Sequence, residues 1–261
     1  MTWLLDCDGV VWLTEQAIPG SADAVASLRA SGSRVVFLTN NSFPRRSDHL
    51  EKLDRLGIPT DPADLLSSAM AAAALMEPGE RALVLGGPGL VEELESRGVA
   101  TVRPGSGRGT GAVDAVVVGL DPAFDYPSLA AATSAVLGGA RLIGTNDDAA
   151  LPTPDGVLPG AGALLAAVAC ASGVVPTVAG KPNAATVDLV RDRVGTVEIV
   201  VGDRPSTDGI LARNLGARFG LVLSGVTEIE HGPLEPEADV EARDLAALVR
   251  SEFGEQAPRT R

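Results

Sequence analysis

The sequence WLLDCDG at residues 3–9 is a short apolar run that ends in two aspartates separated by one residue. Its first part, Trp3–Leu5, is typical of a buried strand. Two later apolar runs, Arg34–Leu38 and Glu198–Val201, also end in polar residues. Such runs alternate with helical patterns along almost the whole chain, which is the βαβ pattern of a mainly parallel sheet. The sequence therefore predicts an α/β fold.

The loop signal Pro78–Gly79 separates two series of alternating strand and helix patterns. The second series extends to about residue 178, after which the first series resumes. We predict one discontinuous domain, residues 1–77 plus 179–253, with a second α/β domain, residues 78–178, inserted into it. Residues 254–261 are predicted to form a disordered tail.

The composition argues against several classes of protein. The 261 residues include 21 Lys+Arg and 34 Asp+Glu, a net charge of −13, and only 3% aromatic residues. Because binding to nucleic acid or anionic lipid needs basic patches, we expect neither nucleic acid nor a membrane as a partner. No apolar run reaches the length of about 18 residues that a bilayer span requires. The first residues also lack the pattern of a signal peptide.

The two cysteines indicate a reducing compartment. Cys7 and Cys170 lie far apart in the sequence and match no zinc-binding or redox spacing. We expect both to be buried, reduced thiols. The predicted localisation is therefore cytoplasmic.

Polar side chains follow three of the predicted strands at the point where each strand ends. Asp6 and Asp8 follow the first strand, and Thr39–Asn41 follows the second. Asp203 follows the third strand, with Asp208 one helical turn further on. Ligands of open α/β sheets bind beyond the carboxyl ends of the strands, so these carboxylates should converge on one small volume. An oxygen-rich site of this kind suits Mg²⁺, which works with phosphates.

The two lysines of the chain, Lys52 and Lys181, have different expected roles. Lys52 lies on the polar face of a predicted helix, and we expect it to be solvated. Lys181 lies in the tight Gly-Lys-Pro loop at a strand end. An ammonium group there would neutralise both a nucleophilic carboxylate and a bound phosphate.

Each of these motifs has an ordinary structural explanation when it stands alone. Asp-x-Asp-Gly is often a turn, Thr-Asn-Asn is often a helix-capping loop, and Gly-Asp-x-x-x-x-Asp can be a turn followed by a cap. The order of the motifs argues for function instead. These three motifs and Gly-Lys-Pro all occur at strand ends, with a domain-sized insertion between the second and the third of the four.

In this combination the chain resembles the haloacid dehalogenase superfamily, and more closely its subgroup with a large class II α/β cap. This subgroup includes nucleotide, sugar, glycerol-phosphate, phosphoglycolate and pyridoxal phosphatases. The resemblance extends from Leu4 to about Val249 and includes the cap segments Val116–Asp121 and Thr145–Asn146. It implies a Rossmann-like, mainly parallel core, an inserted cap, and a Mg²⁺-dependent phosphatase that works through an aspartyl-phosphate.

The resemblance assigns the acidic residues to the chemistry and to the metal. Asp6 matches the nucleophile, and Asp8 matches the general acid that protonates the leaving alkoxide and then activates water. Because the dehalogenases of the superfamily lack this second aspartate, Asp8 favours phosphoryl transfer. The implied Mg²⁺ ligands are Asp203, the Asp6 side chain and the main-chain oxygen of Asp8. Asp208 matches an outer-shell acid that holds a metal-bound water or the lysine.

The polar residues of the second and third motifs match the groups that bind the phosphoryl oxygens. Thr39 matches the hydroxyl donor, with Asn40 and Asn41 as neighbouring donors. Lys181 matches the lysine of the third motif, which both binds phosphate and takes part in catalysis.

The predicted cap loop, residues 147–152, should contact the leaving group of the substrate, and we assign this role to Asp148, Ala150 and Leu151. The small side chains leave few polar contacts for a nucleobase, and the two acids disfavour a highly anionic leaving group. We therefore favour a small polyol or sugar phosphate, such as glycerol phosphate. The loop acids are equally well explained as caps of a turn.

Two alternatives to a phosphatase stay open. A phosphotransferase or phosphomutase of the same fold would use an acceptor other than water. A non-catalytic module that binds a phosphorylated ligand would retain the fold without turnover. Relatives in this superfamily are often dimers or larger assemblies, and the composition leaves a homo-oligomer open.

Overall fold

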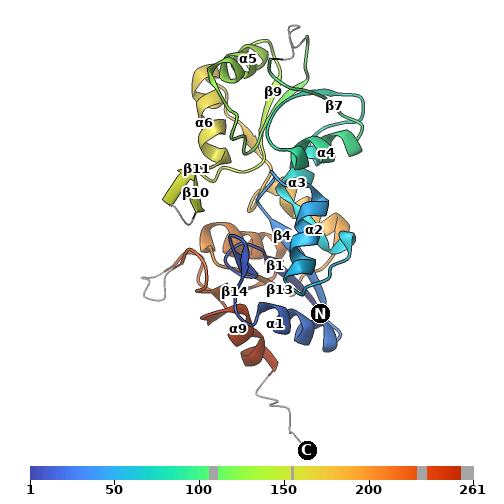
Figure 1. Ribbon diagram of the computed structural model, residues 1–261, viewed down its shortest axis with the longest axis vertical. Helices are drawn as coiled ribbons and strands as arrows, with labels where there is room; N and C mark the ends of the chain where they lie inside the picture. The colour runs from blue at the N-terminus through green and yellow to red at the C-terminus, as the bar shows by residue number, and fades with distance from the viewer. Residues whose placement is uncertain (106–110, 154–155, 228–233, 254–261) are drawn as a thin grey trace, which may run out of the picture. The chain divides into compact units, whose positions relative to one another are not determined.

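A computed structural model describes residues 1–105, 111–153, 156–227 and 234–253 (Figure 1). The predicted tail at residues 254–261 lies outside these residues. The chain forms two compact units. Unit 1 comprises residues 1–38, 50–65 and 191–261, and unit 2 comprises residues 39–49 and 66–190.

Unit 1 is built around a six-stranded sheet with the strand order β15-β14-β13-β1-β4-β5. The central strand β1 pairs in parallel with β4 and β13, and β14 pairs in parallel with β13 and β15. These strands are nearly continuous apolar runs because helices cover a parallel sheet on both faces. Their bounds are β1 Thr2–Asp6, β4 Arg34–Thr39, β5 Leu65–Ser67, β13 Ile199–Gly202, β14 Arg218–Val222 and β15 Val240–Ala242.

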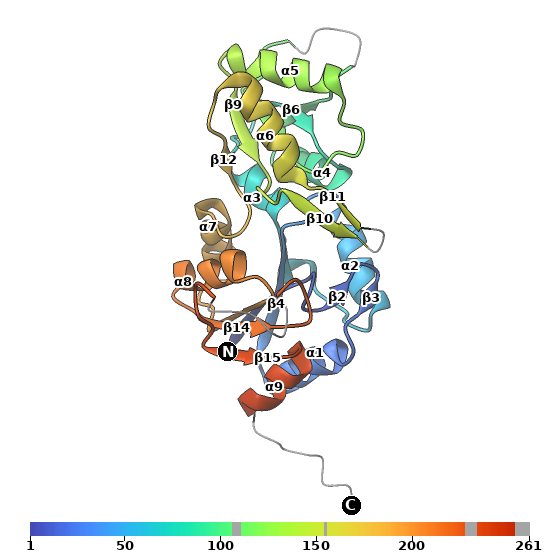
Figure 2. The same ribbon diagram turned by 90° about the vertical axis from the view of Figure 1, so that its left-hand side faces the viewer.

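The core of unit 1 is closed by helices and by a short hairpin. Helices α1 (Ser21–Ala30) and α9 (Leu245–Phe253) pack side by side (Figures 1 and 2). Their apolar faces join the core cluster that contains Trp3, Phe37 and Leu248. Unit 1 also contains helix α8 (Ile210–Leu215) and an antiparallel hairpin of β2 (Trp12–Leu13) and β3 (Gln16–Ala17). Two further helices, α2 (Arg46–Arg55) and α7 (Ala184–Arg193), belong partly to each unit.

Unit 2 contains a five-stranded parallel sheet with the order β12-β9-β8-β6-β7. Helices α5 and α6 pack together and join one apolar cluster with the sheet, while α3 packs on α4. The strands are β6 Arg81–Leu85, β7 Ala100–Val102, β8 Ala115–Val118, β9 Arg141–Gly144 and β12 Thr177–Val178, with a hairpin of β10 Ala150–Thr153 and β11 Gly156–Pro159. The helices are α3 Ser68–Ala74, α4 Pro88–Ser96, α5 Tyr126–Leu137 and α6 Ala161–Ser172.

The two parallel sheets confirm the predicted α/β fold class. The five-stranded sheet lies within residues 81–178, and the strands of the six-stranded sheet lie on either side of it in the sequence. The compact units are divided after residues 38, 49, 65 and 190 instead. The domain boundaries at 77/78 and 178/179 therefore stay a prediction.

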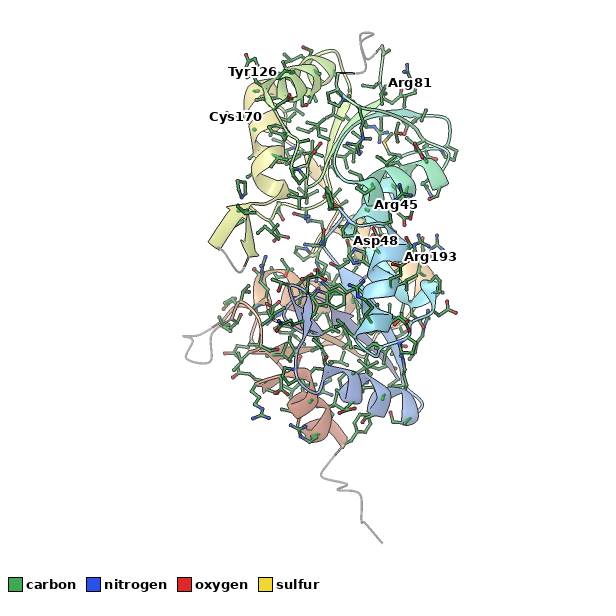
Figure 3. The ribbon with its side chains drawn as sticks, in the orientation of Figure 1. Arg45, Asp48, Arg81, Tyr126, Cys170 and Arg193 are labelled. Carbon is green, nitrogen blue, oxygen red and sulfur yellow. The ribbon has the colours of Figure 1, made fainter. Side chains whose placement is uncertain are left out.

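The prediction for the cysteines is correct for Cys7 and wrong for Cys170. Cys7 is buried, whereas Cys170 on α6 is exposed (Figure 3). Helix α6 buries Leu165 and Val168, which lie three residues apart on one face. Cys170 is rotated away from that face because two residues in an α-helix turn by about 200°. In the described chain neither cysteine is in a disulfide, and no described helix is long and apolar enough to cross a bilayer.

Gly89 gives a test of the packing in unit 2. A Cβ atom at this position in the first turn of α4 would lie 1.8 Å from the main-chain oxygen of Pro44. Alanine normally stabilises a helix by about 1 kcal/mol relative to glycine. Gly89→Ala should instead lower the free energy of unfolding by about 1–3 kcal/mol, because the backbone must move apart. Thermal and urea unfolding measure the change.

The control is Ser96→Ala in the exposed last turn of the same helix. Its free energy of unfolding should stay within about 0.5 kcal/mol of the original protein. A Gly89→Ala protein as stable as this control would contradict the close approach of α4 to Pro44.

Candidate active site

The loop after β1 is a tight turn that fixes Asp6 and presents Asp8. The Asp6 Oδ1 atom accepts a hydrogen bond from the main-chain N–H of Cys7 at 2.7 Å. Gly9 then turns the chain back with φ of 80°, and its N–H donates to the carbonyl of Trp12 at 2.8 Å. Asp8 is exposed, and its Oδ1 atom accepts from the indole Nε1 of Trp12 at 2.9 Å. The sequence therefore produces one half-buried and one exposed carboxylate at the end of the central strand.

Asp203 directly follows β13 and is held by the loop after β14. Its side chain is 5% exposed, and its Oδ2 atom accepts from the N–H of Val226 at 2.7 Å. Its main-chain oxygen accepts from the Thr227 hydroxyl at 2.6 Å. A Cβ atom added at Gly9 would lie 2.4 Å from Asp203 Oδ2, and one added at Gly225 would lie 1.9 Å from the same atom. Glycine is needed at both positions because backbone approaches this carboxylate from two sides.

Asp208 lies in the helical turn Pro205–Gly209 and is 1% exposed. Its Oδ2 atom accepts from the main-chain N–H of Arg204 at 3.3 Å and from the Thr207 hydroxyl at 3.4 Å. A Cβ atom at Gly202 would lie 2.1 Å from its Cγ atom. The glycine that ends β13 therefore lets the Asp208 carboxylate pack against the strand end.

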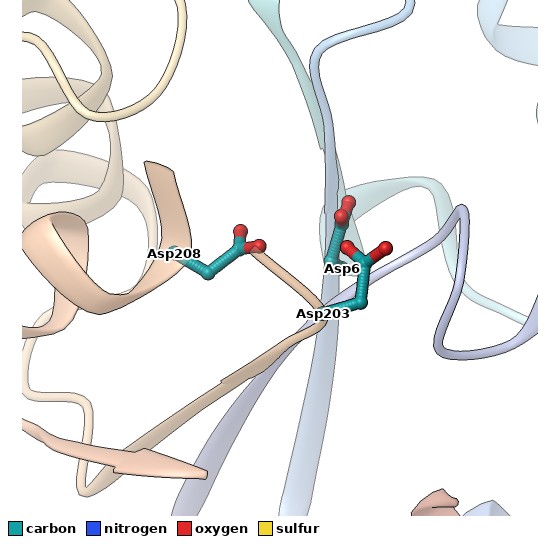
Figure 4. Close-up of side chains that lie close together, drawn as sticks. All are labelled: Asp6, Asp203 and Asp208. Carbon is teal, nitrogen blue, oxygen red and sulfur yellow. The ribbon is translucent and has the colours of Figure 1, made fainter. Parts of the chain in front are cut away.

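Asp6, Asp203 and Asp208 form what we call the acidic cluster (Figure 4). One carboxylate oxygen from each lies within 4.8 Å of the other two. Carboxylates this close repel one another unless a cation lies between them. Hard oxygen donors in such a set suit Mg²⁺, which is commonly bound by one or two carboxylates together with water and phosphate. The donor set therefore fits the predicted metal, and Asp208 belongs to it together with Asp6 and Asp203.

In unit 2, the Thr39–Asn41 segment forms a compact turn at the end of β4. Thr39 is buried, and its Oγ1 atom accepts from the N–H of Asn41 at 3.0 Å. The Asn41 Oδ1 atom accepts in turn from the N–H of Phe43 at 3.1 Å. These hydrogen bonds satisfy two backbone N–H groups where the strand ends, and they fix the orientation of the Thr39 and Asn41 side chains.

Asn40 joins three segments of unit 2 through its side-chain amide. Its Oδ1 atom accepts from the N–H of Lys181 at 2.8 Å, and its Nδ2 atom donates to the Lys181 carbonyl at 3.4 Å. The same Nδ2 atom donates to Asp148 Oδ2 at 3.3 Å. A Cβ atom at Gly180 would lie 2.7 Å from Asn40 Oδ1, so the glycine before the lysine permits this contact. The Asn40 amide holds the Lys181 loop, and its role as a phosphate donor stays a prediction.

The predicted cap-loop residues have different surroundings. Asp148 is half-buried and contacts Asn40, and its N–H donates to Asn146 Oδ1 at 3.1 Å. Ala150 and Leu151 lie on β10 and are exposed. Their contribution to substrate specificity stays a prediction.

The structure brings together Asp6, Asp203 and Asp208 in unit 1, and joins Asn40 to Lys181 and Asp148 in unit 2. Lys181 itself is 3% exposed. Sequence analysis missed the residues that hold Asp203. Val226 and Thr227 follow it by 23 and 24 residues, and no local pattern links them to it.

Sequence analysis was also wrong about Lys52. Its side chain is 15% exposed instead of solvated, because its ammonium group lies against the hairpin β2–β3. Trp12 was missed as a partner of Asp8. A tryptophan four residues beyond an aspartate was the available signal, since a buried indole N–H usually finds an acceptor.

Comparison with known proteins shows where this chain belongs. Residues 3–100 match a family model described as haloacid dehalogenase-like hydrolase, and residues 178–248 match a second model described as HAD-hydrolase-like. Glycerol-3-phosphate phosphatase from Gallus gallus is 37% identical over 266 residues, which cover 93% of this chain and 85% of that protein.

Two solved structures have the same fold. A hypothetical protein from Pyrococcus horikoshii is 35% identical, with a TM-score of 0.89 over 96% of this chain and 99% of that one. A glycerol phosphate phosphatase from Mycobacterium tuberculosis, solved in complex with magnesium, is 33% identical, with a TM-score of 0.84 over 95% of this chain and 75% of that one. The predicted resemblance is confirmed, and the chain belongs to the haloacid dehalogenase-like hydrolases.

Proposed function

We propose that this protein is a Mg²⁺-dependent phosphatase that hydrolyses small phosphorylated metabolites through an aspartyl-phosphate. The observation that carries the proposal is the acidic cluster, in which three carboxylate oxygens lie within 4.8 Å of one another. The cluster combines a carboxylate at the end of the central strand with a donor set that suits Mg²⁺. The phosphatase names of the Gallus gallus and Mycobacterium tuberculosis relatives support it.

Asp6 is the nucleophile in this proposal. One of its carboxylate oxygens forms a bond to phosphorus while the bond from phosphorus to the leaving oxygen breaks, which leaves an aspartyl-phosphate and an alcohol. The Cys7 N–H fixes Asp6 Oδ1 and orients the carboxylate for this attack. Covalent catalysis of this kind divides a slow hydrolysis into two easier steps.

Asp8 is the general acid and base. In the first step its carboxyl proton passes to the leaving oxygen, so that a neutral alcohol departs. In the second step the Asp8 carboxylate takes a proton from the water whose oxygen attacks phosphorus. The bond from phosphorus to the Asp6 oxygen breaks, which releases inorganic phosphate and restores the Asp6 carboxylate. The exposed position of Asp8 gives it access to both the leaving group and water.

The acidic cluster would hold the metal. The proposed ligands are the side chains of Asp6 and Asp203 and the main-chain oxygen of Asp8. Asp208 is the proposed outer-shell acid beside them. Bound Mg²⁺ supplies positive charge that stabilises the phosphoryl oxygens and offsets the repulsion between the carboxylates. The Val226 N–H and the Thr227 hydroxyl keep Asp203 in its orientation.

The motif match also assigns roles to residues of unit 2. Thr39 and Asn41 donate hydrogen bonds to the phosphoryl group, and Lys181 contributes a compact positive charge. Asn40 positions the Lys181 loop through the hydrogen bond from the Lys181 N–H to its Oδ1 atom.

For the substrate we propose a small polyol or sugar phosphate such as glycerol phosphate, as the names of the two relatives suggest. The exposed, apolar Ala150 and Leu151 on β10 would offer little hydrogen bonding to a nucleobase. We further propose a cytoplasmic location, because neither Cys7 nor Cys170 is in a disulfide in the described chain. A homo-oligomer is compatible with this activity.

The direct test is release of inorganic phosphate from a panel of phosphorylated metabolites, with Mg²⁺ or with EDTA. EDTA should abolish release, and Asp6→Asn should lower kcat by more than about 10³-fold, because the amide is not a nucleophile. Asp54→Asn, an exposed position on α2, serves as the matched control and should retain full activity.

If Asp6→Asn releases phosphate at the rate of the control, Asp6 is not the nucleophile. Transfer of phosphate to a second alcohol, without release, would favour the phosphotransferase. Binding of phosphorylated metabolites with neither release nor transfer would favour the binding module.

The acidic cluster also predicts how the metal requirement responds to substitution. Asp208→Asn should raise the Mg²⁺ concentration for half-maximal activity by about 10–100-fold, as is typical for residues that support metal ligands. Asp203→Asn should raise it further, since it removes charge from a proposed ligand. Mg²⁺ titration of phosphate release and calorimetric titration of Mg²⁺ measure the effect. Unchanged Mg²⁺ affinity in both variants would place the metal elsewhere.

A further inference from the structure

The exposed carboxylate of Asp8 has one buried and rigid partner. Trp12 is 1% exposed and belongs to the core cluster of unit 1, yet its Nε1 atom lies 2.9 Å from Asp8 Oδ1. The main chain adds a second constraint, because the Gly9 N–H donates to the Trp12 carbonyl at 2.8 Å. An exposed aspartate alone samples several rotamers. A hydrogen bond to a ring that is packed in the core favours one of them.

Lys52 contacts a face of the same ring. Its Nζ atom lies 4.4 Å from the centre of the Trp12 ring, which is within the range of a cation–π contact. The same Nζ atom donates to the carbonyl of Thr14 and forms an ion pair with Glu15 at 3.3 Å. Thr14 has φ of 51°, a left-handed conformation that is rare for a β-branched residue. The hairpin β2–β3 is thus fixed to α2 at its turn and at its tryptophan.

We propose that Trp12 is a positioning residue for Asp8, and that Lys52 maintains this position by holding Trp12 and the Thr14 turn. The inference rests on the proposed function, because it requires Asp8 to be the general acid. In the first step the Asp8 proton must lie in line with the departing oxygen. A displacement of about 1 Å at such a group can cost on the order of 10²-fold in rate.

The leaving group distinguishes this role from a purely structural one. An alkyl phosphate releases a strongly basic alkoxide and depends on protonation, whereas p-nitrophenyl phosphate releases a weakly basic phenolate and does not. The ratio kcat/KM reports the steps up to departure of the leaving group, so the second step does not obscure the comparison. Loss of Asp8 positioning should therefore reduce kcat/KM for glycerol 3-phosphate selectively.

The experiment compares kcat/KM for these two substrates in Trp12→Phe, which removes the N–H and leaves a smaller aromatic ring. We expect a loss of about 10–100-fold with glycerol 3-phosphate and of about threefold or less with p-nitrophenyl phosphate. The matched control is Trp3→Phe, because the buried Trp3 Nε1 has no hydrogen-bond partner among the described residues. This control should leave the ratio between the two substrates unchanged.

Asp8→Asn separates failure of the inference from failure of the proposed function. Suppose that Asp8→Asn lowers kcat/KM selectively for the alkyl substrate and Trp12→Phe does not. The inference is then overturned, while Asp8 remains the general acid. If Asp8→Asn affects both substrates equally, Asp8 is not the general acid and the inference falls with it.

If Trp12→Phe does not fold, Lys52→Met provides a second test of the same inference. It retains the aliphatic stem and removes the charge, and should show the same selectivity in smaller measure. Fluorescence gives a readout apart from activity, since Trp3→Phe leaves Trp12 as the single tryptophan of the chain. Adding Asp8→Asn to that variant should shift the Trp12 emission, and an unchanged spectrum would contradict the contact.

Discussion

Repulsion between three carboxylates at one edge of a parallel sheet is the constraint on which unit 1 depends. In the acidic cluster their oxygens lie within 4.8 Å of one another, a separation at which like charges in a partly buried setting repel strongly. Each carboxylate therefore accepts a main-chain N–H: Asp6 from Cys7, Asp203 from Val226 and Asp208 from Arg204. These fixed dipoles act together with the proposed metal. The network explains why loops distant in sequence meet at the strand ends.

The backbone can approach these carboxylates only where it carries no side chain. Gly9 and Gly225 lie against the Asp203 carboxylate, and Gly202 lies against Asp208. A methyl group at any of the three would lie less than 2.5 Å from a carboxylate atom. The glycines therefore shape the acidic cluster, because they let N–H groups and strand ends surround its charge.

The convergence of Asp6, Asp203 and Asp208 was predictable, because the carboxyl ends of parallel strands share one edge of the sheet and Asp208 follows Asp203 by one helical turn. The family resemblance supplied their roles. The contacts of Lys52 and Trp12 were not predictable. Lys52 lies on a helix that is polar by its sequence, and only tertiary packing places the hairpin β2–β3 against it. The surroundings of Asp203 depend likewise on a distant loop whose sequence has no characteristic pattern.

The hydrogen bonds of Asn40 have a consequence for the order in which the chain folds. They connect residue 40 to residues 148 and 181, which are 108 and 141 positions away. Closing such long loops in an unfolded chain has a high entropic cost, which falls when the intervening segment is already compact. The five-stranded sheet of unit 2 lies within that segment. The Lys181 loop should therefore reach its native conformation late, after this sheet has formed.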